Sequence, residues 1–218
     1  MSKVAVILSG CGNRDGSELQ ETLSLLLALD RRNVEYQCFA PQGDFAVFNY
    51  VGDERETGER RNIMAEAARV ARGDIRPLAD YRVADFDALA LPGGMGAARN
   101  LSNYASEGAS MCVMAEVETA IREAYKAQKP IVAMCIAPMV LAKVLGEYSV
   151  NLTLGGRNGA ADVAEQLGAH AMVCGPTDVC IDRRNRVLTT PAYMAATRIS
   201  QIFSGADNLV EALMEFLS

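Results

Sequence analysis

The fold is indicated by one short stretch, IVAMCIAP at residues 131–138. Its first four residues are apolar and of strand length, and Pro138 suits the first turn of a helix, where a missing N–H costs nothing. Cys135 stands between the two, with alanines two places before and two places after it. This spacing is what a nucleophile elbow requires, because the tight strand-to-helix turn leaves no room for larger flanking side chains. A buried structural cysteine is the alternative interpretation of the same pattern.

Short apolar runs and longer helical periods alternate along the rest of the chain. Strands are predicted at residues 4–8, 34–39, 88–91, 131–134, 152–154, 179–182 and 187–189. Helices are predicted at residues 17–31, 62–72, 111–127, 138–145, 159–167, 192–203 and 207–217. Apolar strands separated by helices are typical of an α/β fold with a buried, mostly parallel sheet and helices on both faces. The polar segment 43–59 has no clear periodicity and is left without an assigned conformation.

Composition limits the classes of function. The 218 residues, half of them hydrophobic and 22% charged, suit one globular domain over residues 1–218 and exclude a disordered chain. The net charge of -6, without a basic block, argues against nucleic acid as a partner. The apolar runs are too short to span a membrane, so no membrane association is expected.

Localisation and metal binding are inferred from the amino terminus and the cysteines. The first residues match neither a signal peptide nor a transit peptide. The six cysteines form no CxxC pair, which favours reduced thiols and a cytoplasmic location. Because His170 is the single histidine, a structural zinc site is not expected.

Two further segments follow predicted strands, where ligands bind in sheets of this type. In LPGGMG, residues 91–96, paired glycines let backbone amides point into an oxyanion hole, although an ordinary turn has the same composition. In SGCGNRDGSELQET, residues 9–22, Ser17 and Gln20 match a capping box. Glu18 and Glu21 are three residues apart on one side of the helix. Either carboxyl can be a solvated first-turn acid or a proton shuttle beside the reactive sulfur.

Four separated motifs together resemble one known family. They are SGCGxxDGSE at 9–18, LPGGMGAARNLS at 91–102, AMCIAP at 133–138 and LTTPAYM at 188–194. In order and over essentially the whole chain, they resemble the PfpI-like branch of the class I glutamine amidotransferase-like superfamily, and within it the ElbB family. The resemblance implies a flavodoxin-like three-layer sandwich and a homodimer. It also implies a modest, glutathione-independent glyoxalase activity of the lyase type on small dicarbonyls.

The resemblance also assigns roles to residues. It makes Cys135 the nucleophile, with Glu21 as the preferred carboxyl partner and Glu18 as the alternative, and with the amides of Gly94 and Ile136 as the oxyanion hole. The residues expected around the substrate are Gly93, Asn100 and Cys11, with Asn13, Arg14 and Tyr193 at the rim.

The stretch where many relatives carry a triad histidine, residues 151–156, has none, and His170 is interpreted as structural. A late HxE motif is also missing, which disfavours glutamine hydrolysis. The predicted function is therefore conversion of glyoxal to glycolate by a Cys–Glu dyad, without metal, nucleotide or other cofactor. The alternative is redox sensing or metabolite binding through the same cysteine, whose pKa is expected to be low because it lies at a helix amino end.

Overall fold

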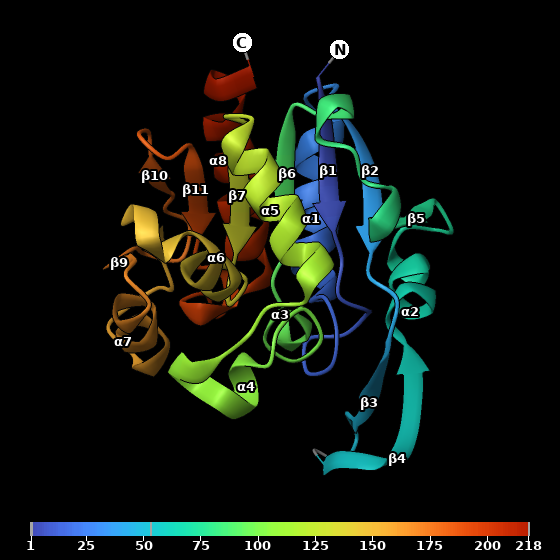
Figure 1. Ribbon diagram of the computed structural model, residues 1–218. Coiled ribbons are helices and arrows are strands. Elements are labelled where there is room, and N and C mark those ends of the chain that lie inside the picture. The colour runs from blue at the N-terminus through green and yellow to red at the C-terminus, as the bar shows by residue number, and fades with distance from the viewer. Residues whose placement is uncertain (1, 53, 218) are drawn as a thin grey trace.

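A central sheet organises the computed structural model, which describes residues 2–52 and 54–217. In this part of the chain the sheet has the strand order β10-β11-β7-β6-β1-β2-β5 (Figure 1). Its strands are β1 (Lys3–Ile7), β2 (Glu35–Ala40), β5 (Ile75–Pro77), β6 (Ala88–Leu91), β7 (Ile131–Met134), β10 (Cys180–Asp182) and β11 (Val187–Thr190). Neighbouring strands are parallel except β10, which is antiparallel to β11.

The five middle strands, β2-β1-β6-β7-β11, follow the flavodoxin-like order 2-1-3-4-5. The direction in which the chain adds strands therefore reverses between β1 and β6, and the loops after these two strands separate to form a crevice. All residues of β6, β7 and β11 are buried. This explains why these strands are continuous apolar runs in the sequence.

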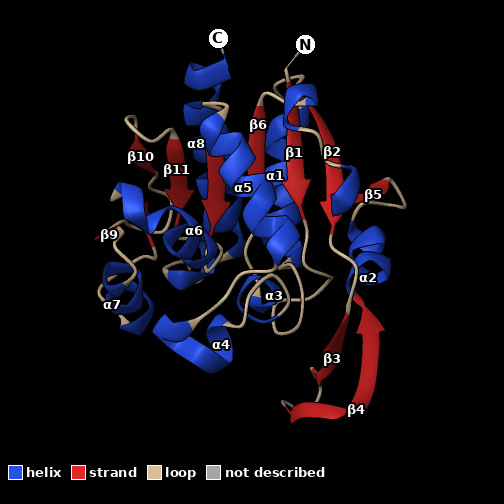
Figure 2. Cartoon of the chain, in the orientation of Figure 1, coloured by secondary structure: helices blue, strands red, loops and turns tan. Residues whose placement is uncertain are grey.

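Helices cover both faces of the sheet (Figure 2). On one face α1 (Leu19–Asp30) packs along α8 (Ile199–Leu217), and on the other lie α5 (Ala115–Lys126) and α6 (Pro138–Leu145). The shorter helices are α2 (Ile63–Val70), α3 (Met95–Arg99), α4 (Tyr104–Glu107) and α7 (Gly159–Gln166). Of the helices in the described ranges, none combines the length and the apolar character needed to cross a membrane. The predicted three-layer, mostly parallel α/β fold is confirmed.

Segment 43–59, which the sequence left unassigned, belongs to a hairpin of β3 (Asp44–Asn49) and β4 (Glu54–Asn62); residue 53 lies outside the described residues. The hairpin projects from the body of the molecule (Figure 1). Asp15, in the loop after β1, holds it: the Phe48 N–H donates to Asp15 Oδ2 at 2.8 Å, and the Tyr50 hydroxyl donates to Asp15 Oδ1 at 2.7 Å. Asp15, which is distant in sequence, therefore positions the β3–β4 hairpin.

The structure differs from the two helices predicted at the carboxyl-terminal end, 192–203 and 207–217. Residues 192–194 form only a 3₁₀ turn, and a single helix, α8, runs from Ile199 through Gly205 to its end. A Cβ at Gly205 would lie 3.2 Å from both Pro176 O and Thr190 Oγ1, so this glycine allows close packing against β11 and does not break the helix.

The predicted strand at 152–154 is β8 (Asn151–Thr153), which pairs with β9 (His170–Met172) outside the central sheet.

Candidate active site

Cys135 lies on the predicted elbow between β7 and α6. Its φ of +59° is in the left-handed region, which costs a residue with a Cβ about 1–2 kcal/mol. Two hydrogen bonds hold the turn, from Cys135 N to Thr190 O at 3.0 Å and from Ala137 N to Met134 O at 3.0 Å. The flanking alanines are fully buried, so the small side chains predicted by the spacing are required by the packing.

Two backbone amides point at the Cys135 sulfur. The N–H groups of Gly94, after β6, and of Ile136, the next residue in the chain, lie near it and act to lower the pKa of the thiol. The conformation of Gly94, with φ of +98°, is one that glycine adopts without strain. These are the two donors that the sequence assigned to an oxyanion hole, and they converge on one point from different loops.

Glu21, in the first turn of α1, is the carboxyl beside Cys135. Its side chain is completely buried. Oε1 accepts the Tyr193 N–H at 3.3 Å. Oε2 has no hydrogen-bond partner among the described residues. The Cys135 thiol and the Gly93 N–H lie near the carboxyl group. The structure therefore places Glu21 beside the sulfur, as preferred from the sequence.

Gly93 makes this close approach possible. A Cβ built on it would lie 2.3 Å from Cys135 Cβ and 2.3 Å from Glu21 Oε2. Any larger residue at position 93 would therefore push the sulfur and the carboxyl apart. The prediction that Gly93 lies at the site agrees with this position.

Burial changes the ionisation of both reactive groups. It raises the pKa of Glu21 from 4.5 to about 8, with a smaller contribution from the nearby Glu18 carboxyl, so Glu21 holds a proton at neutral pH. Burial, followed by the adjacent Glu21, raises the pKa of Cys135 above its ordinary value, although the two amide hydrogen bonds act in the opposite direction. The expectation of a low cysteine pKa is wrong because desolvation outweighs the helix amino end.

Glu18 has a different position from Glu21. Its side chain is the N-cap of α1, with Oε2 accepting the Glu21 N–H at 2.6 Å, and it lines the cavity in front of Cys135. The capping box predicted at Ser17 is therefore wrong. The Ser17 hydroxyl instead accepts the Ser9 N–H at 2.9 Å and joins the two ends of the loop after β1.

A cavity of about 580 Å³ opens in front of the sulfur. Its lining residues come from the loops after β1, β6, β7 and β11 and from the helices α1, α3 and α4. They are Asn13, Glu18, Gln20, Gly94, Met95, Tyr104, Cys135, Ile136, Tyr193 and Met194. The Tyr193 hydroxyl is hydrogen-bonded to Gln20 Oε1 across this wall. Asn13 and Tyr193 were predicted at the rim. Gln20, Met95, Tyr104 and Met194 were missed because nothing in their sequence context distinguishes them from ordinary helix and loop residues.

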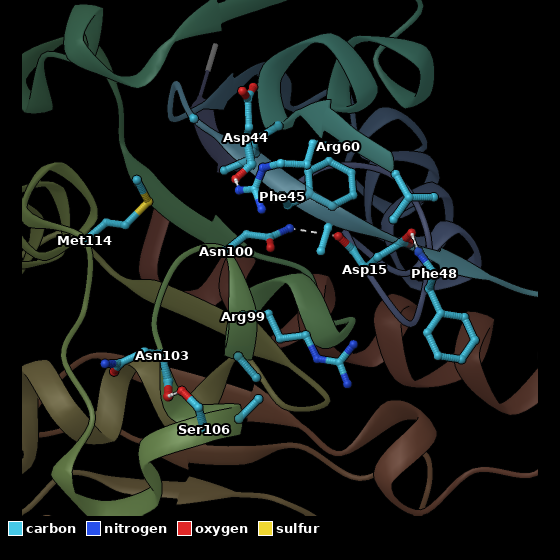
Figure 3. A pocket seen from close by; sticks show the side chains of 16 residues that line it. Asp15, Asp44, Phe45, Phe48, Arg60, Arg99, Asn100, Asn103, Ser106 and Met114 are labelled. Atoms are coloured by element: carbon cyan, nitrogen blue, oxygen red, sulfur yellow. Dashed lines mark hydrogen bonds between the residues drawn. The ribbon is translucent and has the colours of Figure 1, made fainter. Parts of the chain in front are cut away.

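Other predicted substrate contacts lie elsewhere. Asn100 lines a second cavity of about 460 Å³ beside the hairpin (Figure 3). Its amide donates at 2.8 Å to the backbone oxygens of Ser9 and Asp15. Asn100 thus holds the loop after β1 and does not line the Cys135 cavity. Cys11 is half-buried near Glu66 and Arg69 and is also outside that cavity.

His170 is exposed at the start of β9 and does not line the Cys135 cavity. Arg14 does not line the Cys135 cavity either; its guanidinium lies over the Phe48 ring. Across residues 2–52 and 54–217, no three His, Cys, Asp or Glu side chains are grouped so that they could hold a metal ion.

A cysteine on a strand–helix elbow, at the carboxyl edge of a flavodoxin-like sheet, defines the class I glutamine amidotransferase-like fold. Within this class the chain belongs to the DJ-1/PfpI family, whose sequence profile matches residues 21–153. The matched region contains Glu21, Gly94 and Cys135, and it ends before the segment that carries Tyr193.

Similar proteins and structures agree with this assignment. The chain is 39% identical to the ES1 protein homolog, mitochondrial, of Rattus norvegicus, over 98% of this chain and 84% of the rat protein. It is 38% identical to the human glutamine amidotransferase-like class 1 domain-containing protein 3, mitochondrial, over 98% and 83% of the two chains. A crystal structure of an isoprenoid biosynthesis protein with an amidotransferase-like domain from Ehrlichia chaffeensis superposes with a TM-score of 0.91 at 35% identity, covering 98% of this chain and 99% of that one.

The rat and human relatives also correct one prediction. Both are named mitochondrial proteins, which contradicts the cytoplasmic location inferred from the amino terminus. That inference rested on an absent targeting pattern, which is a weaker observation than the names of full-length relatives.

Proposed function

We propose that this protein is an ElbB-type, cofactor-independent glyoxalase that converts small dicarbonyls such as glyoxal into 2-hydroxy acids. The observation that carries the proposal is the convergence of the Gly94 and Ile136 amides and the buried Glu21 carboxyl on the Cys135 sulfur, which faces the cavity. A nucleophile, two oxyanion donors and an acid–base group are the parts that this reaction requires.

In the first step the Cys135 sulfur adds to one aldehyde carbon of glyoxal. The C–S bond forms, the S–H bond breaks, and the carbonyl oxygen takes the proton, giving a hemithioacetal. The Gly94 and Ile136 amides stabilise negative charge on that oxygen as it develops.

In the second step Glu21, as carboxylate, removes the hydrogen from the carbon bonded to sulfur as a proton, leaving an enediolate. The hydroxyl proton on the sulfur-bearing carbon moves to the oxygen of the neighbouring carbon, and return of the first proton to that neighbouring carbon gives the thioester of glycolate. One carbon is oxidised from aldehyde to acid level and the other is reduced from aldehyde to alcohol level, so no external oxidant or reductant is needed. Water then cleaves the thioester to glycolate and restores the thiol. A pKa of about 8 suits Glu21 to gain and lose a proton near neutral pH.

The proposal is tested by following glyoxal loss and glycolate formation by NMR. Cys135→Ala is expected to reduce turnover to the uncatalysed rate. Glu21→Gln is expected to slow turnover severely while Cys135 still reacts with iodoacetamide. Cys112→Ala changes an exposed cysteine outside the cavity and serves as the matched control. Unchanged turnover in Cys135→Ala would refute the proposal.

Redox sensing by Cys135 is the alternative function, because peroxide can oxidise the same sulfur beside the same carboxyl. Burial raises the pKa of the thiol and therefore slows both reactions, so oxidation and turnover have to be compared directly. Mass spectrometry after mild peroxide treatment separates the two functions. Selective Cys135 oxidation together with negligible dicarbonyl turnover would favour the sensor.

A further inference from the structure

The charge on the wall of the Cys135 cavity is of one sign, negative. Glu18 is the charged side chain in its wall, and none of the described residues that line it is Lys, Arg or His. Behind the wall lies the Glu21 carboxyl, which is likewise not paired with a basic group among the described residues. The other polar oxygen- or nitrogen-bearing side chains of the wall are the amides of Asn13 and Gln20 and the phenols of Tyr104 and Tyr193.

Glu18 is fixed in position at the amino end of α1, where its Oε2 accepts the Glu21 N–H at 2.6 Å. Burial raises the pKa of Glu18, and the backbone N–H groups of Glu21 and Gln20 act in the opposite direction by favouring the charged form. The side chain is half-buried, so solvent screens this charge less than it screens a carboxylate on the open surface.

An anion entering this cavity would lose part of its hydration without meeting a cation. Such an uncompensated transfer is unfavourable, and a like charge a few ångströms away adds to the cost. An uncharged aldehyde or dicarbonyl does not have this cost and can use the neutral polar groups of the wall.

We propose that Glu18 selects substrates by charge, admitting uncharged carbonyl compounds to Cys135 and rejecting carbonyl compounds that carry a carboxylate. As a statement about substrates this rests on the proposed function. As a statement about access to the sulfur it does not, because a thiol reagent can report it without turnover.

The test compares Cys135 alkylation by iodoacetamide, which is neutral, and by iodoacetate, which is an anion of nearly the same size. The rates are measured at pH 8 by mass spectrometry of the Cys135 peptide. The exposed Cys112, read in the same spectra, supplies the reference ratio of the two rates. The iodoacetamide-to-iodoacetate ratio at Cys135 is expected to exceed that at Cys112 by at least about fivefold.

Two substitutions shift the charge of the wall in opposite directions. Glu18→Gln keeps the size and an oxygen that can accept the Glu21 N–H, and it is expected to bring the Cys135 ratio close to the Cys112 ratio. Asn13→Asp adds a second carboxylate to the wall and is expected to raise the ratio. Glu165→Gln, which removes an exposed carboxylate of α7 paired with Arg157, is the matched control and should leave the ratio unchanged.

Equal ratios at Cys135 and Cys112 in the unmodified protein would overturn the proposal. A high Cys135 ratio that persists in Glu18→Gln would overturn the assignment to Glu18. Asn13→Asp leaves the N-cap of α1 unchanged, so it can be measured even if Glu18→Gln does not fold. If the Cys135 ratio of Asn13→Asp does not rise, the proposal is overturned.

A substrate arm separates this inference from the proposed function. Glyoxylate, an aldehyde that carries a carboxylate, is expected not to inhibit glyoxal turnover at equal concentration, and to inhibit it in Glu18→Gln. If glyoxal is not turned over at all while the alkylation ratios follow the expected pattern, the proposed function fails and the charge selection stands. Inhibition of the unmodified protein by glyoxylate would count against the charge selection.

Discussion

Replacing Glu21 by glutamine should change how stability depends on pH. The pKa of Glu21 is about 8 in the folded protein and 4.5 when it is unperturbed, so the folded state keeps a proton that the unfolded chain releases between these values. The stability that this proton provides is complete below about pH 4.5 and is lost as the pH rises to about 8. At about 1.4 kcal/mol per pH unit, the loss over this interval is about 5 kcal/mol.

The assay is urea unfolding of both proteins at several values between pH 5 and pH 9. Glutamine does not titrate, so the Glu21→Gln variant lacks this loss. The free energy of unfolding of Glu21→Gln, minus that of the unmodified protein, should therefore increase as the pH rises. Glu165→Gln serves as the control for removal of an exposed carboxylate and should follow the unmodified protein at every pH.

A constant difference between Glu21→Gln and the unmodified protein from pH 5 to pH 9 would refute the reasoning. It would mean that the Glu21 carboxyl titrates in the folded protein as it does in water. Such a group could not serve as a proton shuttle near neutral pH, so the mechanism proposed above would also lose its base.

Three further predictions concern the same region. Alkylation of Cys135 by iodoacetamide, followed by mass spectrometry, should be slower than that of the exposed Cys112 across pH 7–9, since burial and the adjacent Glu21 carboxyl both raise the pKa of the Cys135 thiol; equal rates at the two cysteines would contradict this. Gly93→Ala should lower the free energy of unfolding by about 1–3 kcal/mol and abolish turnover, because its Cβ would overlap the sulfur-bearing side chain and the carboxyl; full activity in this variant, measured beside urea unfolding, would rule the contact out. Asp15→Asn should speed amide hydrogen exchange in β3 but not in β7, because bonds to a charged acceptor are worth about 1.5–3 kcal/mol each; equal exchange before and after the substitution would show that Asp15 does not hold the hairpin.

The centre of the fold could be predicted closely from the sequence. The bounds of β6, β7 and α6 agree with the predicted ranges 88–91, 131–134 and 138–145. Strands buried on both faces are continuous apolar runs, so little else competes for their assignment. The β3–β4 hairpin could not be predicted, because Phe45 and Phe48 are buried only where the hairpin meets the loop that carries Asp15. Such a contact between distant segments leaves no local pattern.

In the candidate site, too, local patterns could be predicted from the sequence and contacts between distant segments could not. Small residues around Cys135 predicted the elbow, because a tight turn excludes larger ones. Helical spacing put Glu18 and Glu21 on one side of α1 but could not decide between them, since that depends on how far β7 lies from each. The prediction of a low pKa for Cys135 was wrong for a related reason. Sequence shows the helix amino end that lowers it, whereas desolvation depends on everything packed around the sulfur.

The place of β11 in the sheet affects the order in which the site can be completed. This strand is late in the sequence, yet it lies between β7 and β10, and the turn after it brings the Tyr193 N–H to Glu21. As a ribosome delivers the chain, Glu21 and Cys135 emerge well before the residues that close the wall over them. Until the last quarter of the nascent chain pairs with β7, the carboxyl lacks this hydrogen bond and stays open to water. The reactive pair is therefore assembled last, although both of its members are made earlier.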